Sequence, residues 1–125
     1  MLGVLLVAVG GAIGSVSRYL VSNWMVARFG SDFPLGTLLV NIVGCFIIGL
    51  FMAMSSERLG MSPYWRLLIA VGFLGGLTTF SSFSYETLRL VEDADMMCAF
   101  YNVGLNLIGG FLAAWLGIII SRLIW

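Results

Sequence analysis

The sequence predicts an all-α membrane protein, with four transmembrane helices in a single domain that covers residues 1–125. Hydrophobic residues make up 61% of the chain, against about 45–50% in soluble domains. Charged residues make up only 10%, where about 25% is usual. So few polar groups cannot cover a soluble surface. Four apolar stretches also reach the length of about 20 residues that a membrane helix requires.

The four predicted spans follow one another with short loops between them. The first runs from about Leu2 to Val26, the second from about Leu35 to Met54, the third from after Pro63 to about Leu88, and the fourth from about Met97 to Ile124. The N-terminal stretch lacks the basic region of a signal peptide, and its helical pattern continues past Tyr19. We therefore expect a retained first span.

The charges in the loops are nearly balanced between the two sides of the membrane. With four spans, one side carries Arg58, Arg66 and Arg122, and the other carries Arg28, Arg89 and, near the end of the first span, Arg18. The excess of Lys and Arg that normally orients a membrane protein is therefore almost absent. Either other signals fix the topology, or the chain inserts in both directions and pairs as an antiparallel, dual-topology homodimer.

The composition leaves little for catalysis or for nucleic-acid binding. The chain has no His and no Lys, its formal net charge is zero, and no basic patch is visible. No nucleophile–base pair or phosphate-binding loop occurs, so we expect no enzyme and no organic cofactor. Cys45 and Cys98 are isolated and are interpreted as small apolar residues in helices.

Polar residues inside the spans mark the candidate functional positions, because an unpartnered polar group in hydrocarbon is costly. Asn41 lies in the second span, with Thr37 four residues earlier on the same helical face. Its amide either joins two helices by a hydrogen bond or donates to an anion in a pathway. In the fourth span Asn102, Asn106 and Gly110 recur every four residues, which allows the same two interpretations.

The third span contains a predicted helix break near Gly75–Thr79. The pair Gly75 and Gly76 is followed by two β-branched threonines, and Gly is a weak helix former. A break at membrane depth is tolerated where it is buried in protein or lines a water-filled cavity, and it exposes main-chain groups that can hold ions. A simple kink packed by neighbouring helices is the alternative.

Two aromatic rings stand within the hydroxyl-rich run that follows this break. Phe80 and Phe83 are three residues apart, so their rings can share a helical face. A ring has a positive edge, which attracts an anion weakly enough to allow its release. Ser81 and Ser82 lie beside the rings and supply hydroxyl donors. Taken alone, two Phe at this spacing are more often core or lipid contacts.

Two charged residues near the spans have several possible roles. The stem of Arg18 can extend its charge to the membrane interface, or the charge can attract anions to a vestibule. Glu86 can cap a helix, pair with an arginine or contact the pathway.

Three segments together resemble the CrcB/Fluc family of fluoride channels. They are GGAIGSVSRY at 10–19, GTLLVNIVG at 36–44 and GFLGGLTTFSSFSYE at 72–86. The third segment is the most specific, and the resemblance in length, span number and motif order covers essentially the whole chain. It implies passive fluoride export through two antiparallel pores in a dual-topology homodimer of the bacterial inner membrane.

The resemblance also implies roles for individual residues. Phe80 and Phe83 would line the pores, Asn41 would be the pore amide, and Arg18 and Glu86 would belong to the vestibule or its support. A structural sodium ion on the dimer axis would be held by main-chain oxygens of Gly75 and Thr78. The remaining expected pathway residues are Thr37, Thr79, Ser81, Ser82 and Asn106.

The main alternative function is proton-coupled export by a small multidrug-type transporter, which also has about four spans and can insert both ways. Such a transporter requires a titratable carboxylate deep in a span. The first span has none, and Glu86 follows the polar run. A non-transporting assembly subunit is a further alternative, but it leaves the concentration of donors at a helix break unexplained.

Overall fold

Four long apolar spans form a helical bundle in the computed structural model, which describes residues 1–57 and 60–124. The first, second and fourth spans are single helices, α1 (Leu2–Phe29), α2 (Leu35–Glu57) and α6 (Met96–Ile124). The third span consists of α3 (Pro63–Trp65), η1 (Arg66–Leu74), α4 (Gly75–Leu77) and α5 (Phe80–Glu92). Each span is long and apolar enough to cross a membrane. The predicted all-α architecture with a broken third span is confirmed, although the first three spans extend three or four residues beyond their expected ends.

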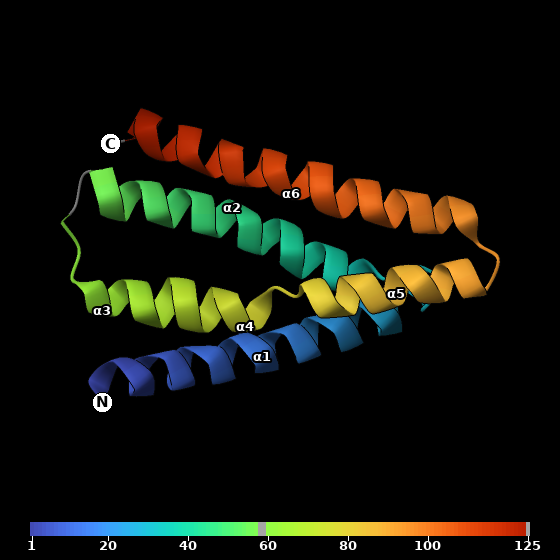
Figure 1. The fold of residues 1–125 in the computed structure, drawn as a ribbon, viewed down its shortest axis with the longest axis horizontal. Helices are drawn as coiled ribbons and strands as arrows, with labels where there is room; N and C mark the ends of the chain where they lie inside the picture. The colour runs from blue at the N-terminus through green and yellow to red at the C-terminus, as the bar shows by residue number, and fades with distance from the viewer. Residues whose placement is uncertain (58–59, 125) are drawn as a thin grey trace.

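The spans run alternately in opposite directions along the bundle. The start of α1, the end of α2, the start of α3 and the end of α6 lie at one end of the bundle, and α5 meets α6 at the other (Figure 1). The most extensive contacts join α2 to α6 and α1 to η1. Arg58, which the charge count assigns to the end with the termini, lies outside the described residues.

The packing of α1 against the third span depends on a π-helix. A methyl group on Gly10 would overlap the carbonyl oxygen of Leu68, and one on Gly14 would overlap that of Phe73. Gly10 and Gly14 are four residues apart, whereas Leu68 and Phe73 are five apart. Because η1 is a π-helix with i→i+5 bonding, it brings carbonyls five residues apart onto successive turns. This geometry matches the four-residue spacing of the glycines.

The apolar core lies where α2 meets the third span. Val40, Leu74 and Leu77 are buried together, and Val21 and Phe73 pack against them. Since Leu74 and Leu77 immediately precede the break, this cluster holds the first half of the third span firmly against α2.

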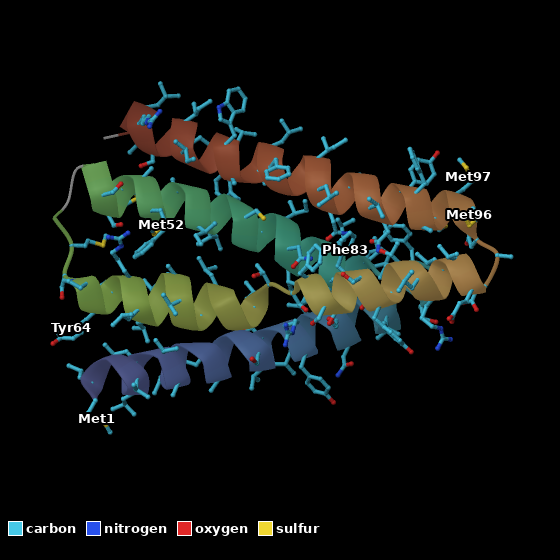
Figure 2. All side chains as sticks on the ribbon, viewed as in Figure 1. Met1, Met52, Tyr64, Phe83, Met96 and Met97 are labelled. Atoms are coloured by element: carbon cyan, nitrogen blue, oxygen red, sulfur yellow. The ribbon has the colours of Figure 1, made fainter. Side chains whose placement is uncertain are left out.

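Many large apolar side chains point outward from the bundle. Phe100, Phe111 and Trp115 on α6 are exposed, as are Met96 and Met97 at its start (Figure 2). Such an apolar exterior suits contact with lipid or with another membrane helix.

Candidate functional site

The helix break lies at Thr78 and Thr79, between α4 and α5. Both residues have extended backbones, with φ −81° and ψ 154° at Thr78 and φ −152° and ψ 120° at Thr79. Thr79 is the N-cap of α5, and its Oγ1 accepts a 3.1 Å hydrogen bond from the main-chain N–H of Ser82. Gly75 and Gly76 remain helical, so the break falls just after them.

Asn41 on α2 satisfies the main chain at the break. Its Oδ1 accepts from the N–H of Thr79 at 2.8 Å, and its Nδ2 donates to the carbonyl of Thr79 at 3.1 Å. Main-chain groups at membrane depth need such partners in place of water. The side chain of Asn41 therefore joins two spans and also stabilises the irregular backbone of the third.

Two carbonyls near the break lose the partners that a continuous helix would give them. In a continuous α-helix, the carbonyl of Gly75 would accept a hydrogen bond from the N–H of Thr79, and the carbonyl of Thr78 would accept one from the N–H of Ser82. Those N–H groups donate instead to Asn41 Oδ1 and Thr79 Oγ1. The oxygens of Gly75 and Thr78 are of the type that hard cations prefer, which fits the sodium site that the family resemblance implies.

Arg18 on α1 reaches the break. Its Nη1 lies 3.4 Å from the carbonyl oxygen of Thr78, to which it donates a hydrogen bond. The guanidinium therefore shares this oxygen with any cation that Gly75 and Thr78 hold. The side chain of Arg18 is therefore next to the break.

The second amide hydrogen of Asn41 begins a series of side-chain hydrogen bonds. Asn41 Nδ2 donates to Asn106 Oδ1 at 3.0 Å, and Asn106 Nδ2 donates to Asn102 Oδ1 at 3.0 Å and to the Asn102 carbonyl at 2.9 Å. Asn102 Nδ2 then donates to Thr87 Oγ1 at 2.9 Å, and Thr87 donates to the carbonyl of Phe83 at 2.7 Å. We call these residues, Asn41, Asn106, Asn102 and Thr87, the amide series.

The sequence predicts Asn106 in the pathway and allows interhelical hydrogen bonding by Asn102, which the structure shows, but it does not predict the part of Thr87. The four-residue spacing of Asn102 and Asn106 was visible, and it did signal one shared face. Thr87 carried no comparable signal, because it is the last of several hydroxyl residues on α5. Its partner lies 15 residues away on another helix.

The two Phe rings are in contact but have different surroundings. Their centroids are 5.5 Å apart and their planes meet at 61°, which is an edge-type contact. Phe83 is 6% exposed and points into the bundle, where it is labelled in Figure 2, whereas Phe80 is 73% exposed. The pair therefore extends from the interior of the chain to its surface.

A cavity of about 310 Å³ lies beside the break. It is lined by seven of the predicted site residues: Asn41, Gly75, Thr78, Thr79, Phe80, Phe83 and Asn106. Most of its wall is otherwise apolar, with contributions from Ile48, Leu74 and Leu107. A cavity with a few convergent polar groups in an apolar wall is the usual form of a small-ligand site.

Other predicted residues lie outside that cavity. The hydroxyl of Ser81 is 3.2 Å from that of Thr79, so it remains close to the break, while Ser82 contributes its main-chain N–H to the cap. Thr37 donates a 2.8 Å hydrogen bond to Glu86 Oε1. These two residues line a separate hollow of about 190 Å³ toward the end of α1.

Glu86 has one satisfied oxygen and one unsatisfied oxygen. Its Oε1 accepts from Thr37, whereas its Oε2 is buried and has no hydrogen-bond partner among the described residues. The contact that the structure shows is a hydrogen bond from Thr37 on a neighbouring span, whereas a helix cap, a pair with an arginine and a contact with the pathway stay predictions for Glu86. The structure thus pairs two predicted site residues, Thr37 and Glu86, at one end of the site.

Comparison with known proteins gives consistent matches along the chain. The family model for CrcB-like protein, Camphor Resistance (CrcB), matches residues 5–118. A protein of Geotalea uraniireducens named fluoride-specific ion channel FluC is 50% identical over 119 residues, which cover 95% of this chain and 96% of that protein. A protein of the same name from Sulfurihydrogenibium sp. is 47% identical, over 96% of this chain and 97% of that protein. Another from Geobacter metallireducens is 45% identical, over 98% of both chains.

Proposed function

The chain belongs to the CrcB family, and on that premise we propose that it is a fluoride-specific ion channel of the membrane. Fluoride crosses passively, down its electrochemical gradient. It enters a cell from acidic surroundings as the neutral acid, ionises inside, and leaves through the channel. This lowers cytoplasmic fluoride without a coupled energy source.

The observation that supports this function best is the cavity at the helix break. Asn41 and Thr79 bring polar groups to one side of it, and the contacting rings of Phe80 and Phe83 lie on another. Fluoride is small and strongly hydrated, so a selective pore must replace its water with hydrogen-bond donors. Amide and hydroxyl groups supply these donors, and ring edges complete the shell. None of the residues that line the cavity is an Arg or a Lys, so no fixed positive charge in its wall holds fluoride too tightly for release.

We propose further that two copies associate as an antiparallel homodimer. The balanced arginines remove the usual bias for one orientation. Phe80, 73% exposed, and the exposed backbone of Gly75 lie beside a cavity that a single chain leaves partly open. A second copy would cover these groups and complete the pathway.

A structural sodium ion fits this dimer. The carbonyls of Gly75 and Thr78, released from helical pairing, would hold it together with the same two oxygens of the second copy. The ion would supply positive charge at the centre of the assembly. Arg18, which donates to Thr78, would help to place that carbonyl.

The function is tested with purified protein in liposomes loaded with fluoride. We expect fluoride efflux down its gradient, measured with a fluoride electrode, and much slower efflux of chloride in a parallel preparation. Liposomes that retain fluoride would contradict the proposal. Proton-dependent uptake of lipophilic cations would instead indicate the multidrug-type transporter.

The antiparallel dimer is tested separately by labelling. In a variant with Cys45 and Cys98 replaced by Ala, a single cysteine introduced at the end of α5 should react with a membrane-impermeant reagent from both sides of intact vesicles, in about equal amounts. Reaction from one side alone would contradict dual topology and leave the channel function standing.

A further inference from the structure

The direction of every hydrogen bond in the amide series is determined at its Phe83 end. Thr87 Oγ1 lies 2.7 Å from the carbonyl oxygen of Phe83, which can only accept, so the hydroxyl proton points there. Oγ1 can then only accept from its other neighbour, and Asn102 must present its NH₂. The oxygen of Asn102 therefore faces Asn106, which must present its own NH₂.

The same direction is required from the opposite end. The N–H of Thr79 can only donate, so Asn41 must present Oδ1 to it and turn its NH₂ toward the carbonyl of Thr79 and toward Asn106. Asn106 accepts this hydrogen bond through its Oδ1. The two ends agree, so no amide in the series can reverse without leaving a buried group unpaired.

The burial of the middle of the series makes this constraint strong. Asn102 is 0% exposed and Asn106 is 9% exposed. A buried donor without an acceptor loses its hydrogen bond to water and gains nothing in exchange. The NH₂ of Asn106 is held by two acceptors of Asn102, its carbonyl and its Oδ1, so the oxygen of Asn106 faces Asn41.

We propose that Thr87 is a positioning residue for fluoride conduction, one that acts through Asn102 and Asn106 on the amide of Asn41. This rests on the proposed channel function. Thr87 lies outside the cavity, but its hydroxyl accepts from Asn102 and so turns the oxygen of Asn102 toward Asn106. Together with the Asn102 carbonyl, that oxygen holds the NH₂ of Asn106, so Asn106 presents its own oxygen to Asn41.

This arrangement prepares Asn41 to receive an anion. Both hydrogens of its NH₂ are engaged, one by the carbonyl of Thr79 and one by Asn106 Oδ1. A fluoride ion in the cavity can take the place of Asn106 Oδ1, because Asn106 keeps its two bonds to Asn102 when that contact opens. The donor is therefore satisfied when no ion is present and available when one arrives.

Two substitutions at position 87 test the proposal in the full-length protein. Thr87→Val keeps the shape and removes the hydroxyl, so the buried NH₂ of Asn102 loses its acceptor and the series is no longer held at its Phe83 end. We expect fluoride efflux from liposomes to fall about tenfold, with a changed fluoride concentration for half-maximal flux. Thr87→Ser retains the hydroxyl and should restore both values.

A matched control removes a similar hydroxyl from the same helix. Ser84 donates to the carbonyl of Phe80 at 2.9 Å, as Thr87 does to Phe83, but it is outside the amide series. Ser84→Ala should leave the flux and its concentration dependence unchanged. This control separates the loss of a helix-bound hydroxyl from the loss of the series.

The orientation of the amides can be measured without any transport. The chain has four asparagines, so labelling with [¹⁵N]asparagine gives four side-chain NH₂ signals in NMR spectra. Thr87→Val should shift the signals of Asn102, Asn106 and Asn41, and Thr87→Ser should return them. Asn23, exposed on α1, serves as the internal reference.

The outcomes distinguish this proposal from the function on which it rests. If the wild-type protein conducts fluoride and Thr87→Val has the same efflux and the same NH₂ signals, the role of Thr87 is overturned and the channel function stands. Shifted signals with unchanged efflux would overturn the link to conduction. Absence of wild-type efflux would reject the channel itself, and this proposal with it.

Discussion

Asn41 contacts both main-chain polar groups of Thr79, accepting from its N–H at 2.8 Å and donating to its carbonyl at 3.1 Å. A side chain from one span thereby replaces the helical partners that another span has lost at its break. Asn41 also lines the cavity. Substitutions of Asn41 should therefore affect the shape of the break and the ion pathway together.

Asn41→Asp should greatly reduce fluoride flux. The carboxylate keeps an acceptor for the N–H of Thr79 but loses both donors, and its charge repels an anion. Efflux from liposomes measures the loss, and size-exclusion chromatography checks that assembly is intact. Asn23→Asp makes the same substitution at an exposed position, and equal loss in both variants would contradict a local role for Asn41.

Phe80→Ile and Phe83→Ile should both reduce flux but differ in their effect on stability. Phe83 is 6% exposed, so its replacement should lower the free energy of unfolding by on the order of 1–2 kcal/mol. Phe80 is 73% exposed in the single chain, so loss of its ring should reduce flux with a smaller effect on the fold. Efflux and thermal unfolding measure the two effects.

The control for the rings is Phe100→Ile, because Phe100 is 74% exposed on α6 and lies away from the cavity. It should leave flux unchanged. Normal flux in both Phe80→Ile and Phe83→Ile would contradict the assignment of the rings to the pathway.

Thr37→Val should impair the channel through Glu86. Glu86 Oε2 already lacks a hydrogen-bond partner among the described residues, and the substitution removes the donor to Oε1 as well. We expect a reduced flux in efflux assays and recovery in Thr37→Ser. Ser56→Ala removes an exposed hydroxyl elsewhere on α2 and should have no effect. Equal flux in Thr37→Val and wild type would show that the pair is not needed for conduction.

Gly10→Ala should destabilise the bundle without touching the cavity. The added methyl group would overlap the carbonyl of Leu68 and approach the N–H of Phe73 to 2.9 Å, and both are main-chain groups that cannot turn aside. Overpacking of this kind costs about 1–3 kcal/mol. Gly104→Ala on α6 meets no atom within 4 Å and should be neutral or stabilising. Thermal unfolding compares the two, and equal stability would contradict the close approach of α1 and η1.

Hydrophobic length was sufficient to predict the four spans, because it depends on composition alone. The break was also predictable within a few residues, since Gly75 and Gly76 weaken a helix. The structure assigns Gly76 a second role, as an added methyl group there would lie 2.6 Å from the carbonyl oxygen of Gly11. The glycines thus permit close packing, and the extended residues are the threonines that follow.

The partners within the site were less predictable. Helix spacing identified Asn102 and Asn106 as one face, but which neighbour that face meets depends on the rotation and tilt of each helix. The π-helix in η1 changes the rotation of every residue after it, and no local propensity marks it. For this reason the contact of Arg18 with Thr78, and the contact of Thr87 with Asn102, became visible only in three dimensions.

The bonds between Asn41 and Thr79 also constrain how the protein is made. During synthesis α2 leaves the ribosome before the third span, so Asn41 enters the membrane before its partner exists. Until the two spans meet, the side chain of Asn41 has no partner on the third span, and the third span can satisfy its main chain only by remaining a continuous helix. We therefore expect the break to form only when α2 docks against the third span. A chain whose second span is replaced by a simple apolar helix should insert normally and yet keep its third span unbroken.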